Sequence, residues 1–205
     1  MSAQIEWAEP GDAKAVADRI AAAVAEPGRK WLAVPGGSTP AKVFAELAVR
    51  GLDWSDCEVW LTDDRQVPHD HPASNYGKLA AALGPTEATL AGLSEGAVPP
   101  PFDLVWLGMG ADGHIASLFP EMAAGERAGP HVIATVPEPL PPEAPFSRLS
   151  LNLEALVAAD AIILAVTGRD KRVVLEEAMA GRVQHLPVAQ LLRAARCPVT
   201  IYWSE

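Results

Sequence analysis

The sequence has few cysteines, fewer positive than negative charges and no long apolar run, and each shortage excludes a class of protein. The two cysteines, Cys57 and Cys197, are too far apart to form a CxxC redox motif or a paired-cysteine metal site. Lysine and arginine number 16 against 26 acidic residues, a net charge of −10, so no nucleic-acid partner is expected. The best apolar run, 156–166, is broken by Asp160, so no membrane span is expected.

The beginning of the sequence also lacks the basic and apolar segments of a secretory signal, and no internal repeat is found. Together with the low cysteine content, this predicts a cytoplasmic protein. The length of 205 residues fits one domain spanning residues 1–205. Hydrophobic residues make up 49% of the chain, which is enough for a large core.

Short apolar segments alternate with segments of helical spacing. Strands are expected at 31–34, 58–62, 103–107, 131–136, 148–151, 161–166 and 199–203. Helices are expected at 13–26, after Pro40, at 75–83, 86–93 and 152–157, after 171, and at 188–195. This alternation predicts an α/β protein with three layers, in which helices cover both faces of a mostly parallel sheet.

A glycine-rich loop joins the first expected strand to the helix after it. The loop contains Gly36, Gly37, Ser38 and Thr39. Free N–H groups and the positive end of the helix dipole make such a junction a possible phosphate site. An ordinary turn capped by Ser38 or Thr39 is the alternative.

Two further strand ends carry charged residues. Asp63, Asp64 and Arg65 follow the strand at 58–62. Lys171 lies in the first turn of the helix that follows the strand at 161–166. Carboxylates with an arginine suit a polyhydroxylated, phosphorylated ligand, because a guanidinium donates to phosphate through two N–H groups. A solvated turn is the alternative for the first group, and a surface lysine for the second.

A fourth loop follows the strand at 103–107. It contains three glycines within six positions. Asp112 lies between the last two glycines, and His114 follows the third. Carboxyl ends of parallel strands share one edge of the sheet, where ligands bind, so the four loops are expected to form one site. A bare polar turn is the alternative for this loop alone. His69 and His71 have no third ligand nearby, so neither a metal nor a cofactor is expected.

Four motifs, in order along essentially the whole chain, resemble the 6-phosphogluconolactonase family of the pentose phosphate pathway. They are Gly36–Pro40, Asp63–Pro68 with Ser74 and Asn75, Leu107–Pro120, and Gly168–Lys171. Two residues depart from the family pattern: Asp64 replaces a glutamate and Ile115 replaces a threonine.

The resemblance implies a fold shared with glucosamine-6-phosphate deaminases and ribose-5-phosphate isomerases. It also implies hydrolysis of 6-phospho-D-glucono-1,5-lactone to 6-phosphogluconate, with His114 as acid and base and Asp112 orienting it or binding a sugar hydroxyl. The substrate-binding residues expected by this resemblance are Gly36, Gly37, Ser38, Thr39, Asp63, Arg65, Asn75 and Lys171. A monomer or weak homodimer without a cofactor is expected.

Two other functions remain as alternatives. One is a deaminase-like isomerase, because Asp112 to Ala116 resembles both families; however, Phe119 stands where deaminases have a glutamate, and Arg65 where they have an aromatic residue. The other is a non-catalytic phosphosugar-binding module. A serine hydrolase is disfavoured because no GxSxG motif is present.

Overall fold

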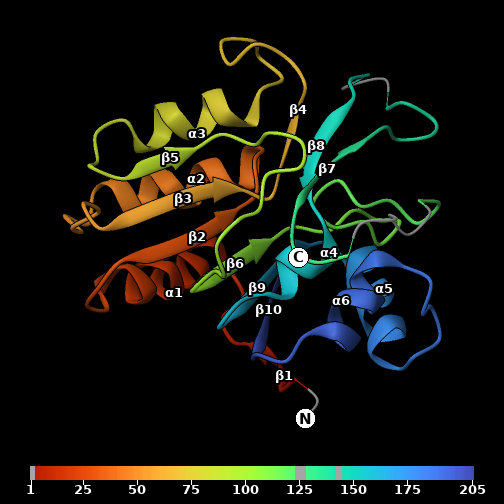
Figure 1. The fold of residues 1–205 in the computed structure, drawn as a ribbon. Helices are drawn as coiled ribbons and strands as arrows, with labels where there is room; N and C mark the ends of the chain where they lie inside the picture. The colour runs from red at the N-terminus through yellow and green to blue at the C-terminus, as the bar shows by residue number, and fades with distance from the viewer. Residues whose placement is uncertain (1–2, 123–127, 142–144) are drawn as a thin grey trace.

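The largest element of the fold is a seven-stranded parallel sheet (Figure 1). The computed structural model describes residues 3–122, 128–141 and 145–205, without the side chains of Ser38 and Ala41. The strands lie in the order β1 (Ile5–Ala8), β10 (Val199–Ser204), β9 (Ile162–Thr167), β6 (Leu104–Leu107), β2 (Lys30–Val34), β3 (Cys57–Leu61) and β5 (Thr89–Ala91).

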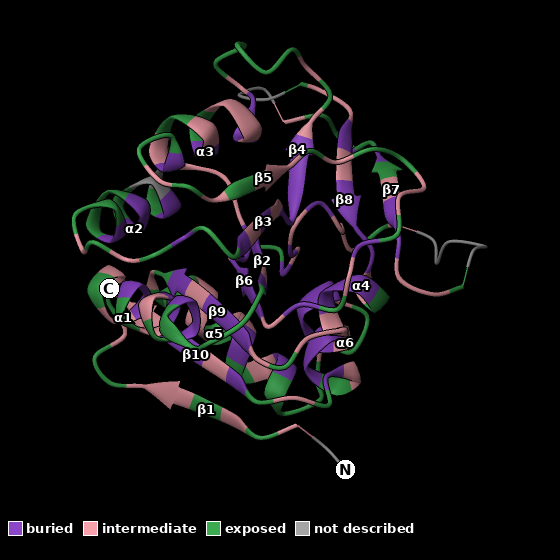
Figure 2. Ribbon diagram, turned by 60° about the vertical axis from the view of Figure 1, so that its left-hand side comes forward, coloured by how far each residue is buried: buried purple, intermediate pink, exposed green. Residues whose placement is uncertain are grey.

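Helices cover both faces of this sheet, which confirms the three-layer α/β prediction (Figure 1). One face carries α1 (Ala13–Ala25), α2 (Ser38–Ala48) and α3 (Asn75–Leu83), and the other carries α4 (Leu153–Val157), α5 (Arg169–Met179) and α6 (Pro187–Ala194). Side chains alternate between two apolar cores: Leu104 and Trp106 join the first, whereas Val105 and Leu107 join the second. Such strands are buried on both faces, as Figure 2 shows for the centre of the sheet.

A second, antiparallel sheet lies beyond the carboxyl end of the first. It contains β4 (Asp63–Arg65), β8 (Arg148–Leu151) and β7 (Val132–Thr135), in that order. Thr62 joins the two sheets, because its N–H donates to Val34 at 2.9 Å and its carbonyl accepts from Leu151 at 2.9 Å. The small sheet is therefore held at the edge where ligands were expected.

Three helices begin at a residue whose side chain caps them. Asp12, Ser74 and Asn152 cap α1, α3 and α4, each accepting a hydrogen bond from an N–H in the first turn. No helix within the described residues is both long and apolar enough to cross a membrane.

The helix expected at 86–93 is wrong. This segment forms β5, which pairs in parallel with β3 and closes one edge of the large sheet. Pairing with β3 satisfies its backbone groups, and this tertiary interaction outweighs a weak helical pattern. Strands β1 and β4 were not expected at all.

Candidate active site

His114 and Asp112 form a hydrogen-bonded pair in the loop that follows β6. Nδ1 of His114 lies 2.7 Å from Oδ1 of Asp112, and the His114 N–H donates to the same oxygen at 3.2 Å. An ionised carboxylate only accepts, so Nδ1 carries the proton in this arrangement. The other ring nitrogen, Nε2, has no hydrogen-bond partner among the described residues, and the side chain is 31% exposed. Its lone pair is thus open to a ligand.

The charge of Asp112 favours this arrangement. Partial burial opposes ionisation, but the attraction of His114 and hydrogen bonds from its backbone and ring outweigh burial and lower the pKa of Asp112. The carboxylate is therefore ionised at neutral pH. It fixes the ring's orientation and stabilises a positive charge on the imidazole.

Glycines allow the loop to take its shape. A Cβ added at Gly110 would lie 2.5 Å from Oδ1 of Asp112 and would also overlap the His114 ring. Gly113 has a φ of +81°, which residues with a side chain rarely adopt. Its carbonyl accepts a hydrogen bond from Val188 at 3.1 Å, which ties the loop to α6.

The start of α2 offers unoccupied backbone donors. Ser38 and Thr39 were expected to cap α2, but the N-cap residue is Gly37, at φ +113°, and no side-chain capping bond is found there among the described side chains. The side chain of Ser38 lies outside what the structure describes. An uncapped helix start leaves N–H groups free for an anion, as the phosphate hypothesis requires.

Three of the four predicted loops meet in one cleft of about 260 Å³. Its lining includes Gly36 and Thr39 from the α2 junction, Gly108 and Met109 from the loop after β6, and Lys171 from α5. Lys171 forms no ion pair within the described part of the chain, so its charge faces the cleft without a protein partner. These residues therefore line one cleft, and their role in binding substrate stays a prediction.

The fourth loop contacts the same region through Asn75. This buried residue packs its side chain against Gly36, where a Cβ would overlap it. Asn75 Oδ1 accepts from Nη1 of Arg65 at 2.7 Å, and its Nδ2 donates to the carbonyl of Asp63 at 3.0 Å. Asn75 therefore positions both Arg65 and the glycine turn.

Asp63 points into the protein. Its carboxylate accepts from the hydroxyl of Ser117 at 2.6 Å and from that of Thr62 at 3.4 Å. This contact joins β4 to the loop that carries His114. In the structure the Asp63 oxygens are bonded to these protein hydroxyls. The substrate contact expected of Asp63 stays a prediction.

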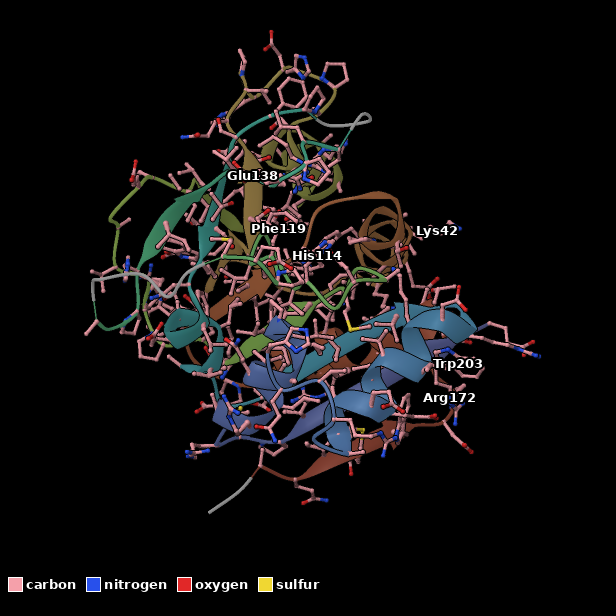
Figure 3. All side chains as sticks on the ribbon, turned by 90° about the vertical axis from the view of Figure 1, so that its right-hand side faces the viewer. Lys42, His114, Phe119, Glu138, Arg172 and Trp203 are labelled. Carbon is pink, nitrogen blue, oxygen red and sulfur yellow. The ribbon has the colours of Figure 1, made fainter. Side chains whose placement is uncertain are left out.

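Two residues beside the histidine were not expected in the site. The ring of Phe119 lies 5.0 Å from that of His114, and the guanidinium of Arg148 lies 5.6 Å from the Phe119 ring. Figure 3 shows Phe119 next to His114. Arg148 and Ser150 alternate with leucines in β8, and this alternation is the sequence signal for a strand with one polar face. In the structure both polar residues are buried.

The histidines of the 66–76 loop have other partners. His69 stacks on Tyr76 with ring centroids 3.9 Å apart, and His71 Nδ1 accepts from the Ala73 N–H at 3.0 Å. Over the described ranges, no three histidine, cysteine or acidic side chains gather as a metal site would require.

Comparisons with known proteins agree on one family. The family model for glucosamine-6-phosphate isomerases and 6-phosphogluconolactonase matches residues 11–89 and 85–203. The 6-phosphogluconolactonase of Mesorhizobium japonicum is 36% identical, covering 92% of this chain and 87% of that protein. The one from Pseudomonas aeruginosa is also 36% identical, covering 94% and 89%.

Solved structures have the same fold. A 6-phosphogluconolactonase from Shewanella baltica superposes with a TM-score of 0.82 and 29% identity, covering 100% of this chain and 98% of that one. A monomeric glucosamine-6-phosphate deaminase superposes with a TM-score of 0.76 at 15% identity, covering 100% and 98% of the two chains. The second likeness is one of fold alone.

Proposed function

The chain belongs to the family of glucosamine-6-phosphate isomerases and 6-phosphogluconolactonases, and on that premise we propose how it works. It hydrolyses 6-phospho-D-glucono-1,5-lactone to 6-phosphogluconate, a step of the pentose phosphate pathway. The observation that carries our mechanism is the His114–Asp112 pair, 2.7 Å apart, with Nε2 of the partly exposed ring unpaired among the described residues.

The reaction starts with a water molecule activated by His114. Nε2 takes a proton from the water as its oxygen forms a bond to C1, and the carbonyl electrons move onto the C1 oxygen. Histidine titrates near neutral pH, so it serves as a base at working pH; such positioned catalysis contributes about 10²–10⁴-fold. Asp112 keeps the proton on Nδ1 and stabilises the imidazolium.

The second step opens the ring. The oxyanion electrons reform the C1 carbonyl, the bond between C1 and the ring oxygen breaks, and the imidazolium returns its proton to that oxygen. The acid released then loses a proton to solvent and leaves as a carboxylate. A lactone is already an activated ester, so this route needs no covalent intermediate.

The phosphate is proposed to bind at the start of α2. Gly36 and Gly37 bring backbone N–H groups close, and Thr39 and Lys171 lie in the same cleft. A doubly negative group there would complement the helix dipole and the unpaired lysine. Local positive charge is needed, because the protein as a whole carries −10.

The test is to replace the proposed base. His114→Ala is expected to lower kcat by about 10²–10⁴-fold, after subtraction of spontaneous hydrolysis, with an unchanged circular dichroism spectrum. His185→Ala is the control, because this exposed histidine lies on another loop. Near-wild-type hydrolysis by a folded His114→Ala protein would rule out the mechanism. Release of ammonia from glucosamine 6-phosphate would favour the isomerase alternative, and phosphosugar binding without turnover the binding module.

Three broader expectations are also proposals. The loop after β6 of the large sheet carries His114, and β4 of the small sheet carries Arg65. Because the proposed site uses residues from both sheets, we treat residues 1–205 as one domain. A cytoplasmic location, expected from the low cysteine content and the lack of a secretory signal, and a monomer or weak homodimer are the other two. Sedimentation velocity at micromolar concentration tests the last.

A further inference from the structure

Two arginines lie opposite each other on neighbouring strands of the small sheet. Arg65 of β4 and Arg148 of β8 are direct cross-strand partners. Directly opposite residues project to the same side of a sheet, and like charges in such positions destabilise it. Arg148 is only 7% exposed, and Nε of each arginine is buried with no hydrogen-bond partner among the described residues.

The surrounding acids do not neutralise this pair. Neither arginine makes an ion pair with any acidic residue in the described parts of the chain. Asp63 is near enough to offset part of the charge, but its oxygens bond to Ser117 and Thr62. The Asp64 carboxylate accepts from backbone N–H groups of residues 65, 75 and 76.

The electrostatic cost shows in Arg148 itself. Burial, and then repulsion by Arg65, lower the pKa of its guanidinium. A buried cation without a counter-charge is costly. Arg148 is buried and Arg65 beside it is half-buried, with Nη1 of Arg65 donating to Ala73 and Asn75. A buried guanidinium next to a second one is what an anion-binding subsite requires before its anion arrives.

The position of the pair relative to His114 identifies the anion. The Arg148 guanidinium lies 5.6 Å from the Phe119 ring, whose other neighbour is the His114 ring at 5.0 Å. Arg148 thus lies on the histidine's side of the site, whereas Arg65 also bonds to Asn75, which packs against Gly36. The proposed phosphate position involves a different set of groups, the start of α2 and Lys171.

We propose that Arg148 and Arg65 together bind the oxygen atoms at C1 of the substrate. The pair would receive the lactone carbonyl, stabilise the oxyanion formed by water attack, and hold the product carboxylate. Two guanidinium forks match the planar, two-oxygen geometry of a carboxylate. This inference rests on the proposed function, and it makes Arg148 a further substrate-binding residue.

Binding measurements separate the two ends of the ligand. Isothermal titration uses 6-phosphogluconate, which has a carboxylate at C1, and glucitol 6-phosphate, which has an alcohol there and the same phosphate. Arg148→Met should weaken 6-phosphogluconate binding by about 10- to 100-fold, the value of a charge-assisted hydrogen bond. It should leave glucitol 6-phosphate binding within about twofold of wild type. Lys171→Met should weaken both ligands.

Arg172→Met is the matched control. Arg172 also stacks on aromatic rings, Trp7 and Trp203, and Figure 3 shows it beside Trp203 and apart from His114 and Phe119. It should change neither affinity. Equal weakening of both ligands by Arg148→Met would assign the pair to the phosphate, and unchanged binding of both would make Arg148 purely structural. Either result overturns the proposal.

A second measurement does not depend on a variant. In a crystal of the unaltered protein with 6-phosphogluconate, a carboxylate oxygen should lie within hydrogen-bond distance of the Arg148 guanidinium. A carboxylate bound elsewhere overturns the inference even if Arg148→Met does not fold. Since these readouts are of binding, they are independent of whether the protein turns over the lactone, and failure of the proposed function would be seen separately.

Discussion

Replacing Gly110 with alanine tests whether the orientation of the imidazole limits catalysis. The φ of Gly110 lies outside the left-handed region, so alanine can adopt the backbone conformation there. The added Cβ would nevertheless lie 2.5 Å from Oδ1 of Asp112 and would overlap the His114 ring. The three heavy atoms nearest to the added Cβ all belong to the catalytic pair.

The size of the effect follows from the required movement. Ordinary carbon contacts need about 3.5 Å, so the carboxylate must move by about 1 Å, and the ring by more. A displacement of about 1 Å at a reacting group costs on the order of 10² in rate. Overpacking also costs about 1–3 kcal/mol of stability. We expect kcat for lactone hydrolysis to fall about 100-fold while the protein stays folded at 25 °C.

The assay is continuous titration of the acid released, with the uncatalysed rate subtracted and thermal unfolding measured in parallel. Gly92→Ala is the control, because its Cβ would meet Tyr76 at an ordinary 3.7 Å in a loop outside the site. If Gly110→Ala kept kcat within about threefold of wild type, the reasoning from ring position would be refuted. Loss of activity in the Gly92→Ala control would show that the assay reports general damage.

Three further results are expected. Asp112→Asn should lower kcat by about 100-fold, because the imidazolium loses its neighbouring charge; the stabilisation from Asp112, whose pKa is lowered, disappears as pH falls through that pKa. Burial raises the pKa of the Cys57 thiol to about 11, so this thiol ionises at a lower pH in the unfolded chain than in the folded protein. The free energy of unfolding measured in urea should therefore drop by about 1 kcal/mol between about pH 8 and about pH 10. Cys57→Ala should remove this drop. Asn152→Ala should cost about 2–3 kcal/mol in urea unfolding, because its Oδ1 accepts from the N–H groups of Ala155 and His131, both at 3.0 Å.

The sequence predicted the layers because they depend on local patterns. Buried parallel strands appear as continuous apolar runs, and glycine-rich polar segments follow them. Alternation of the two then places those loops at one edge of a sheet. This alternation alone accounts for the position of Thr39, Gly108 and Lys171 along one cleft.

What the sequence did not predict depends on pairing between distant segments. The 86–93 segment became an edge strand because β3 offered it backbone partners, which no local pattern records. Strand β4 consists of Asp63, Asp64 and Arg65, residues with poor strand propensity that form a strand by pairing with β8. The position of Arg148 opposite Arg65 depends on that pairing, which explains why Arg148 was not expected in the site.

The order of strands in the large sheet affects how the chain acquires it during synthesis. Strand β1 pairs with β10 alone among the described strands, although almost the whole sequence separates them. On a ribosome, which releases the amino-terminal end first, β1 emerges long before its partner exists. Its backbone donors and acceptors must stay bonded to water, or be shielded by a chaperone, until the last strand leaves the exit tunnel.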